Sequence, residues 1–481
     1  MAHTTSIILK RVLYRKMFLR HTLSMNPKRQ TELFCDWLEN YLNYERIPNR
    51  EGFTLETMRY MVNRLENPQN AVKSIHVAGS KGKGSVSMML SQLLTRSGLR
   101  SGLYLSPHIL DFTERITRAG TPFPDEVYGN AADRMVPRIE SMIPENVPGK
   151  REPTWFELVT LFAFMVFDTA SMQWTVIETG LGGRLDATNV IIPEATVFTP
   201  IELEHTEYLG DTLEKIAAEK AGIMKPGVPV FTSRQHPEVR IILEKRAKEL
   251  SCPFFSMEDA VASIEPSLSV TGQSIEVTYN TLPQGPVFHE PFRARLSMLN
   301  RIQGQNAALA VYVFRYLFPD SAHDVLAAGL FSSWLPGRFE VIATDPLVVL
   351  DGAHTVDSIC QTLKTFDSLV HDTGELVFAC AADKRVDVIA GEFGKRFSKI
   401  TVTRPGDIKK SDIGHTAQAF QRTLKGCTDV ELEANPDFYD VLSGAFGRAR
   451  STRKPLLVTG SFYLVAEAKK ILERDFQDLK N

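Results

Sequence analysis

The stretch "SIHVAGSKGKGSV", residues 74–86, constrains the fold of this chain more than any other. A short apolar run at 74–79 ends in glycine. The apolar residues that follow have the spacing of one helix face, with Gly98 placed as a C-terminal cap: Val86, Met89, Leu90, Leu93 and Leu94. The run "SGLYLS" at 101–106 has the composition of the next strand. The glycine-rich loop therefore joins a strand to a helix in a βαβ unit, which predicts a parallel sheet.

The loop has the chemical groups of a phosphate-binding loop. Small residues let backbone N–H groups converge on anionic oxygens at a helix N-terminus, and a lysine and a hydroxyl can serve the outer phosphates and Mg²⁺. The loop supplies these groups from Gly79, Ser80, Lys81, Gly82, Lys83, Gly84 and Ser85. It departs from the usual pattern of Gly, four residues and Gly-Lys-Ser/Thr, because its hydroxyl comes one residue late, at Ser85. We expect a nucleotide site; the alternative is a glycine-rich turn with exposed lysines.

The alternation of strands and helices continues along the chain. Further strands are predicted at 173–180, 194–201 and 228–233, and a helix at 212–223. Between 260 and 295 the alternation of polar and apolar residues predicts a β-hairpin appended to the parallel sheet. The segment 335–342, "LPGRFEVI", is typical of a linker, and strand and helix patterns restart after it.

The predicted fold class is α/β with two domains, as the length of 481 residues favours. The domain at 31–336 is expected to be a P-loop-type parallel sheet with helices on both faces. A smaller Rossmann-like α/β domain is expected at 337–481. The segment 1–30 holds seven Lys/Arg and no Asp or Glu. It is expected to be either a disordered tail or a wrongly assigned start, with Met17 or Met25 as the true first residue; a mitochondrial targeting segment is the alternative.

Composition excludes several classes of function. The net charge is 55 − 57 = −2, so there is no basic excess to hold a polynucleotide. The five cysteines are scattered without a Cys-x-x-Cys pair, which argues against a disulfide framework or a zinc site and fits a reducing cytosol. No apolar run approaches the length of a membrane span. We expect a cytoplasmic enzyme with small-molecule substrates.

Seven segments, taken in order, resemble the folylpolyglutamate and dihydrofolate synthases of the Mur-ligase superfamily, over residues 31–475. They are "HVAGSKGKGSV", "LSPHILDFTERI", "ETGLGGRLDATN", "HTEYLGDTLEKIAAEKAGIMKPG", "LPGRFE", "LDGAHT" and "VTGSFYLVAE". The resemblance implies ATP and two Mg²⁺ ions, folate or dihydropteroate and L-glutamate as substrates, and a monomer. Three positions depart from the usual family pattern: Glu204 stands for Asp, "NRIQ" at 300–303 for Gly-x-His-Gln, and Thr355 for the Asn of many bacterial members.

Two residues suggest metal chemistry. Glu178 ends an apolar strand, where a carboxylate can hold a metal that bridges phosphates or can cap a neighbouring helix. Lys220 shares a helical stripe with Ile216 and Ala217, and a lysine there either extends its amine to solvent or has a lowered pKa. A neutral amine can form a carbamate with CO₂. The resemblance implies that Lys220 is carbamylated and that the metal ligands are Ser85, Ser106, Glu178, His205 and Lys220.

The resemblance also assigns the remaining site residues. Lys83, His205 and Lys220 are the expected catalytic residues. Asn306, Arg338, Asp351 and His354 join the loop in binding the nucleotide across a domain cleft. The expected substrate residues are Arg184 and Asp186, with Phe156 stacked on the pterin; Phe156 is otherwise a core aromatic.

The expected reaction is ATP-dependent addition of L-glutamate to the terminal carboxylate of a folate through an acyl phosphate. A second activity on dihydropteroate stays open. The alternatives are another Mur-type amino-acid ligase, a bare ATPase or kinase, and a catalytically silent nucleotide- or folate-binding protein.

Overall fold

The computed structural model describes residues 27–43, 54–370, 372–382, 384–394, 396–407 and 409–480. Most of the basic segment 1–30 lies outside these residues, and its last four, 27–30, belong to a helix. Contacts divide the chain into two units. The first comprises residues up to Ala262 together with 279–289 and 306–329, and the second comprises 263–278, 290–305 and 330–481.

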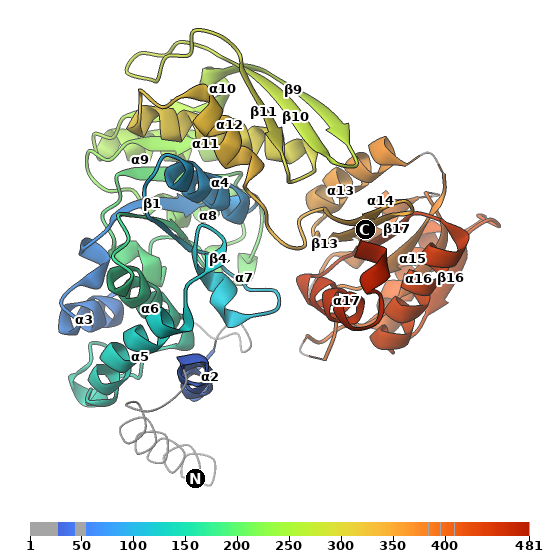
Figure 1. Ribbon diagram of the computed structural model, residues 1–481, viewed down its shortest axis with the longest axis horizontal. Coiled ribbons are helices and arrows are strands. Elements are labelled where there is room, and N and C mark those ends of the chain that lie inside the picture. The colour runs from blue at the N-terminus through green and yellow to red at the C-terminus, as the bar shows by residue number, and fades with distance from the viewer. Residues whose placement is uncertain are drawn as a thin grey trace. The chain divides into compact units, whose positions relative to one another are not determined.

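The first unit contains an eight-stranded sheet in the order β4-β3-β2-β5-β1-β6-β7-β8. Figure 1 labels two of these strands, β1 and β4. Its strands are β1 (Lys73–Ala78), β2 (Ser101–Tyr104), β3 (Ile116–Arg118), β4 (Thr121–Pro122), β5 (Trp174–Glu178), β6 (Ala195–Phe198), β7 (Val230–Thr232) and β8 (Phe254–Ser256). The six strands from β2 to β8 are parallel, and β3 and β4 are antiparallel additions at one edge. The predicted parallel sheet is confirmed.

Helices cover both faces of this sheet. They are α2 (Pro27–Leu38), α3 (Glu56–Arg64), α4 (Lys83–Arg96), α5 (Asp125–Glu140), α6 (Trp155–Thr169), α7 (Thr206–Leu209), α8 (Leu213–Ala221), α9 (Pro237–Glu249), α10 (Met257–Ala260), α11 (Arg301–Leu317) and α12 (His323–Phe331). Tyr104, Ile177 and Phe198 share one face by their register, and they pack in clusters formed with α6, α8 and α9. On the other face, Phe231 of β7 contacts Tyr312 and Tyr316 of α11.

The second unit contains two separate sheets. One has six strands in the order β12-β13-β17-β14-β15-β16, and all but the edge strand β12 are parallel. Its strands are β12 (Glu340–Thr344), β13 (Leu347–Asp351), β14 (Gly374–Phe378), β15 (Phe397–Val402), β16 (Glu431–Ala434) and β17 (Leu456–Thr459). The helices are α13 (Val356–Leu369), α14 (Val386–Phe393), α15 (Ile413–Thr423), α16 (Phe438–Thr452) and α17 (Phe462–Asp475).

Two local predictions were wrong. The segment 260–295 forms a separate three-stranded sheet from β9 (Val261–Ser269), β10 (Gly272–Tyr279) and β11 (Phe292–Leu296), and this sheet is not joined to the parallel one. Half-buried antiparallel strands alternate whether or not they join a larger sheet, so the pattern could not decide this. The expected linker at 335–342 ends earlier, because Glu340 begins strand β12.

Candidate active site

The glycine-rich loop lies at the carboxyl end of β1, as predicted, and leads directly into α4. Gly79 has φ +148°, and a Cβ there would lie 2.0 Å from the Thr199 hydroxyl. Gly82 has φ +82°, forms the N-cap of α4, and would place a Cβ 2.8 Å from Asn306 Oδ1. Only glycine fits these two positions, so the backbone can approach a ligand closely. The close approach also places Asn306 at the loop.

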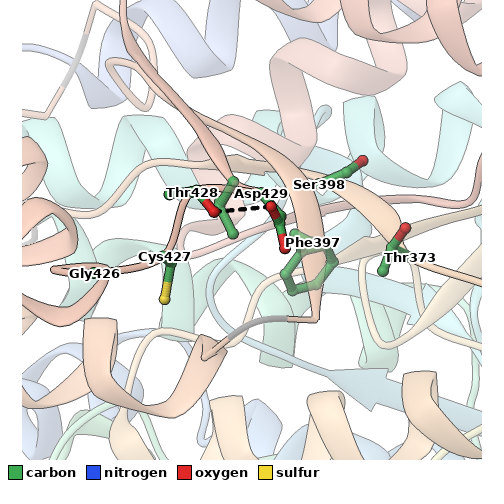
Figure 2. Close-up of a pocket in the computed structure, with 8 residues that line it drawn as sticks. Thr373, Phe397, Ser398, Gly426, Cys427, Thr428 and Asp429 are labelled. Atoms are coloured by element: carbon green, nitrogen blue, oxygen red, sulfur yellow. Dashed lines mark hydrogen bonds between the residues drawn. The ribbon is translucent and has the colours of Figure 1, made fainter.

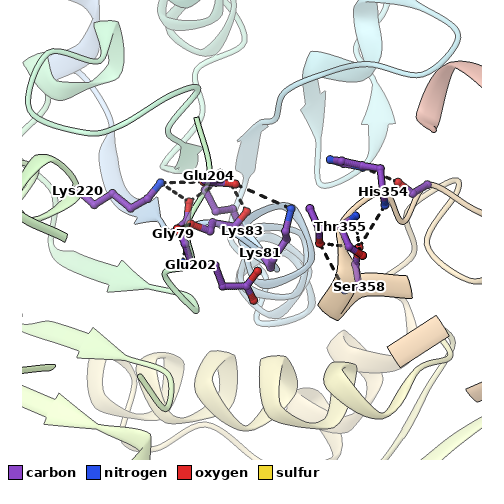
Figure 3. Close-up of polar contacts among 11 residues, drawn as sticks. Gly79, Lys81, Lys83, Glu202, Glu204, Lys220, His354, Thr355 and Ser358 are labelled. Atoms are coloured by element: carbon purple, nitrogen blue, oxygen red, sulfur yellow. Dashed lines mark hydrogen bonds and ion pairs between the residues drawn. The ribbon is translucent and has the colours of Figure 1, made fainter. Parts of the chain in front are cut away.

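Two predicted catalytic lysines converge on one carbonyl oxygen of the loop. Lys83 Nζ donates a hydrogen bond to the Gly79 carbonyl at 3.1 Å, and Lys220 Nζ donates to the same oxygen at 2.7 Å (Figure 3). Lys220 lies in the last turn of α8, and its side chain reaches the loop from there. The structure thus brings together residues that are 137 positions apart (220 − 83).

Glu204 is the counter-ion of this lysine cluster. Its Oε1 lies 3.2 Å from Lys220 Nζ, and its Oε2 lies 3.9 Å from Lys81 Nζ. Burial opposes its charge, but Lys83, Lys220 and Lys81 together lower the pKa of Glu204 to about 2. The carboxylate is therefore ionised at neutral pH, and it offsets the repulsion among the three ammonium groups.

Lys220 is almost completely buried, with 1% of its side chain exposed. Burial lowers its pKa to about 8, although Glu204 acts in the opposite direction. Near neutral pH, a larger fraction of Lys220 is therefore in the neutral amine form than would be the case for an exposed lysine. The amine ends inside the site, next to Glu204 and the loop, so it does not extend to solvent.

Oxygen donors lie at the carboxyl ends of neighbouring strands. Glu178 ends β5 in register with Val77 of β1, so its buried carboxylate lies beside the start of the loop. Its Oε2 accepts a hydrogen bond from the Ser106 backbone N–H at 3.1 Å. Ser85 is buried in the first turn of α4. Carboxylate and hydroxyl oxygens are donors that Mg²⁺ accepts, with phosphates and water completing its shell.

His205 has an exposed side chain at the N-cap of α7, with a left-handed backbone of φ +49°. Its charge is among those that lower the pKa of Glu204, so it belongs to the same cluster. Among the residues that the structure describes, no three His, Cys, Asp or Glu side chains gather as a metal site. The predicted ligand set contains only two such side chains, Glu178 and His205, so a metal there would also need Ser85, Ser106, Lys220 or the phosphates.

The predicted substrate residues have strong partners within the protein. Asp186 is buried and accepts hydrogen bonds from the backbone N–H groups of Gly180, Leu181 and Thr188 and from the Thr188 hydroxyl. Burial raises the pKa of Asp186, and these donors act against the rise. Arg184 forms an ion pair of 2.8 Å with Glu219. These contacts fix the loop 180–186 from within.

Phe156 is half-buried at the start of α6. A Cβ on Gly180 would lie 2.2 Å from the tip of the Phe156 ring, so this ring lies directly against the glycine segment of the loop 180–186. The ring of Tyr104 lies 6.4 Å from it.

The second unit brings together three of the predicted nucleotide residues. The Arg338 guanidinium lies 4.3 Å from the centre of the Phe462 ring, and the His354 ring lies 6.2 Å from the same ring. Asp351 is buried and accepts from the N–H groups of Phe339 and Ala353 and from Thr362 Oγ1. Burial raises the pKa of Asp351, and its donors and Arg338 oppose that rise. Thr355 caps α13 through the N–H of Ser358.

A cavity of about 250 Å³ lies elsewhere in the second unit (Figure 2). It is lined by Thr373, Phe397, Ser398, Gly426, Cys427, Thr428, Asp429 and Val430. These residues precede or begin β14, β15 and β16, so the cavity is at the amino ends of the strands. Ligands of open α/β sheets bind at the carboxyl ends, where Asp351 and His354 lie.

Two contributors were not named as site residues from the sequence. In the sequence, Glu204 stands out only as a departure from the family pattern. Its position after β6, the strand next to β1 in the sheet, does indicate that it lies near the loop. Phe462, the ring beneath Arg338, lies within a quoted motif, but nothing in its local pattern distinguishes it from a core aromatic.

Comparisons with known proteins identify what this chain is similar to. Residues 337–462 match the family model "Mur ligase, glutamate ligase domain". The chain is 29% identical over 445 residues to a dihydrofolate synthase/folylpolyglutamate synthase of Bacillus subtilis, covering 91% of this chain and 98% of that one. It is 32% identical over 418 residues to a probable bifunctional folylpolyglutamate synthase/dihydropteroate synthase of Haloferax volcanii. That match covers 86% of this chain and about half, 48%, of the relative's length.

A solved structure of Mycobacterium tuberculosis folylpolyglutamate synthase, complexed with ADP and AMPPCP, superposes with a TM-score of 0.81 at 26% identity. The match covers 94% of this chain and all of that one. A match of this extent is longer than either unit alone, so it includes residues of both. The chain is therefore similar over nearly its whole length to folylpolyglutamate synthases and dihydrofolate synthases, and its residues 337–462 match the glutamate ligase domain of the Mur ligases.

Proposed function

We propose that this chain is an ATP-dependent ligase that adds L-glutamate to the terminal carboxylate of a folate. The observation that carries the proposal is the loop 79–85, in which Lys83 and the buried Lys220 meet at one carbonyl oxygen. This is a site for a highly charged phosphate group, and it occurs in a chain that covers 98% of a dihydrofolate synthase/folylpolyglutamate synthase.

ATP is the proposed phosphoryl donor. The glycines, Ser80, Lys81 and Ser85 surround the helix N-terminus of α4, where backbone N–H groups and the helix dipole attract phosphate. The similar M. tuberculosis structure contains ADP and AMPPCP, and a further structure is described as an FPGS–AMPPCP–folate complex at 25% identity. When ATP binds, Lys83 would exchange its hydrogen bond to the Gly79 carbonyl for contacts with the outer phosphates. Asn306 of α11 would keep the loop in place.

Mg²⁺ is the proposed metal, in two sites. When bound, it would neutralise phosphate charge and orient the γ-phosphoryl group. Glu178 and His205 would hold one ion, with Ser106 or Ser85 contributing, and Lys220 as a carbamate would hold the second. The cluster of oxygen donors at the strand ends fits a hard cation better than a site of nitrogen and sulfur ligands.

Lys220 is proposed to act as a carbamate. Its burial and its pKa of about 8 favour the free amine that CO₂ requires, and the carbamate anion would supply the metal-binding oxygens that an ammonium lacks. Glu204 would then be a counter-ion of Lys220 only in the uncarbamylated form, and it would remain paired with Lys81.

The second unit is proposed to complete the nucleotide site with Arg338, Asp351 and His354. The Arg338 guanidinium would bind a phosphate, whereas Asp351 positions the neighbouring backbone by accepting the N–H groups of Phe339 and Ala353. The proposed functional domains are 31–336 and 337–481. In the first, Phe156, Arg184 and Asp186 are proposed to form or support the folate side.

The two steps of the proposed reaction follow from the negative charge of the folate carboxylate. A free carboxylate resists attack by an amine, so the γ-phosphoryl group of ATP is first transferred to it, which gives ADP and an acyl phosphate. The amine of L-glutamate then attacks the carbonyl, inorganic phosphate leaves, and the amine loses a proton to form the amide. Lys83 and Arg338 would offset charge in the first step, and exclusion of water would protect the acyl phosphate.

The second proposed activity is glutamylation of dihydropteroate. The relatives from Bacillus subtilis and M. tuberculosis are both named dihydrofolate synthase/folylpolyglutamate synthase, which supports it. The enzyme is proposed to act as a cytoplasmic monomer on small molecules. Within the described part of the chain, no helix has the length and apolarity to cross a membrane.

The decisive experiment measures ADP release by the purified protein with Mg²⁺-ATP. L-glutamate, tetrahydrofolate and dihydropteroate are each supplied and omitted in turn. Release that requires glutamate and a pterin substrate supports the ligase, and the pterin dependence separates one activity from two. Release without either substrate would indicate an ATPase, and no release with any combination would indicate a silent binding protein.

A further inference from the structure

The turn 336–339 carries Arg338 into strand β12. It contains two residues with positive φ, Gly337 at +64° and Phe339 at +49°. A phenylalanine adopts this left-handed conformation only where its surroundings enforce it. The turn is therefore held by specific contacts, and these contacts decide where the Arg338 side chain begins.

Three hydrogen bonds fix the backbone of the turn. The Phe339 N–H donates to Asp351 Oδ2 at 2.7 Å, and the Gly352 N–H donates to the Gly337 carbonyl at 2.9 Å. The third comes from the Gly337 N–H to Glu340 Oε2 at 2.8 Å. Glu340 thus acts on the residue directly before Arg338.

The other carboxylate oxygen of Glu340 is held by a lysine. Lys469 Nζ of α17 lies 2.5 Å from Glu340 Oε1, and the two side chains are only 13% and 9% exposed. A pair this well shielded has a defined geometry, and removing one partner leaves an uncompensated buried charge. Lys469 therefore fixes the orientation in which Glu340 receives the Gly337 N–H.

The helix α17 also contacts the Arg338 side chain directly, through another of its residues. Phe462 is the first residue of α17, and its ring lies beneath the Arg338 guanidinium at 4.3 Å. Phe462 and Lys469 are seven residues apart, which places them on one face of the helix. One face of α17 therefore contacts both the side chain of Arg338 and, through Glu340, the backbone of its turn.

We propose that Lys469, acting through Glu340, is a positioning residue that fixes Arg338 for the nucleotide. The inference rests on the proposed function, in which Arg338 binds an ATP phosphate. Lys469 itself lies against Glu340 and near the Trp334 ring, at 5.4 Å, so its effect would pass through the turn.

The test is a double-mutant cycle on the full chain with Lys469→Met, Arg338→Ala and the double variant. The measurements are KM for ATP, kcat, the affinity for AMPPCP by calorimetry, and the melting temperature. The matched control is Lys470→Met, because Lys470 is the adjacent lysine, 57% of its side chain is exposed, and its one ion pair among the described residues is with Glu467 of its own helix. Glu340→Gln is a second variant that keeps an acceptor for Gly337 but lacks the charge that binds Lys469.

We expect Lys469→Met and Glu340→Gln to raise KM for ATP by about fivefold or more, and Lys469→Met to have less than about a twofold effect once Arg338 is alanine. Lys469→Arg should restore most of the affinity, and Lys470→Met should change nothing. Equal effects of Lys469→Met in both backgrounds, or a lower melting temperature with unchanged nucleotide affinity, would overturn the inference alone. If Arg338→Ala leaves AMPPCP affinity unchanged, the assignment of Arg338 in the proposed function is wrong, and the inference is overturned with it.

Discussion

At the scale of single residues, Lys220 shows most clearly how the fold changes the chemistry of a side chain. It lies on a stripe with Ile216 and Ala217, as the sequence predicted, and all three are buried. The sequence left two outcomes open for this lysine, extension to solvent or a lowered pKa. The structure decides for the second, because the amine ends between Glu204 and the Gly79 carbonyl.

Replacement of Lys220 tests the carbamate. We expect Lys220→Ala to lower kcat by about 100-fold or more, as loss of a charge-stabilising group at a reacting centre does. Lys215→Ala is the matched control, since Lys215 is in the same helix but is exposed, and within the described part of the chain its ion pair is with Asp211. Assays with and without bicarbonate, and with a short-chain carboxylic acid added to Lys220→Ala, complete the test. Partial rescue of Lys220→Ala by the acid supports a carbamate. If the activity of the parent chain does not change when bicarbonate is depleted, the carbamate is contradicted.

Replacement of Gly79 tests the close packing of the loop. A Cβ at Gly79 would lie 2.0 Å from Thr199 Oγ1 and 2.9 Å from the Thr199 carbonyl oxygen, so the backbone itself would have to move. We expect Gly79→Ala to cost about 2 kcal/mol or more of unfolding free energy and to remove nucleotide binding. Gly98→Ala is the control, because Gly98 has φ +83° but nothing near its Cβ, and it should cost about 1 kcal/mol. Urea denaturation of both variants measures the difference; equal losses would show that the packing against Thr199 is unimportant.

At the scale of elements, the strands and helices that carry the loop were predictable because each has a strong periodic pattern. α4 begins at Lys83, and Gly98 follows its C-terminus with positive φ, as expected. Strands β5, β6 and β7 lie within their predicted segments. The three-stranded sheet β9–β11 could not be placed, since alternation along a strand reports the burial of its faces and not the identity of its neighbours.

Strand β1 contains a polar residue that its pattern does not explain. His76 is fully buried, and its Nε2 lies 2.8 Å from Thr188 Oγ1, which in turn donates to Asp186. Because the Thr188 hydroxyl donates its hydrogen bond to Asp186, it can only accept one from His76. The neutral His76 ring therefore carries its proton on Nε2 and donates it to the Thr188 oxygen. This chain of contacts connects the centre of the sheet to the loop 180–186.

The burial of His76 predicts a dependence of stability on pH. Burial lowers the pKa of His76 from 6.5 to about 3, with Lys225 acting in the same direction. Above pH 6.5 the His76 ring is neutral in both the folded and the unfolded chain, so its contribution to the free energy of unfolding is fully present. As pH falls from 6.5 toward 3, the unfolded chain binds a proton that the folded chain does not, so stability is lost. In His76→Gln this loss should disappear, which makes the pH profile shallower by up to about 1.4 kcal/mol per pH unit. Parallel urea titrations between pH 7 and pH 4 measure the slopes, and identical slopes would contradict the prediction.

At the scale of the whole molecule, the proposed reaction requires groups from both units. If Lys83 and Arg338 bind the same nucleotide, AMPPCP with Mg²⁺ should slow amide hydrogen exchange in the loop 79–85 and in the segments 336–339 and 350–355. A ligand that binds only the folded state at 100 times its Kd stabilises that state by about 2.7 kcal/mol. Protection in both regions is expected for the parent chain, and Arg338→Ala should keep it only in the loop. Protection confined to the first unit in the parent chain would contradict a shared nucleotide.

The sequence by itself determined the α/β class, the parallel sheet, the position of the glycine loop and the order of the family segments. These features depend on local spacing: apolar residues at helix or strand periods, and glycines where the backbone must turn. The predicted residues Lys83, Lys220 and Asn306 meet at the loop because the elements that carry them have a fixed order in the fold.

Only the tertiary structure decided the surroundings of each predicted site residue. Asp186 and Asp351 resemble ligand-binding carboxylates in sequence, but each is buried with several backbone donors and holds a loop in place. Glu204 and Phe462 became visible only through contacts with residues distant in the chain. The physical reason is that the charge, burial and hydrogen bonds of a side chain depend on its neighbours in space, and local spacing along the sequence does not specify them.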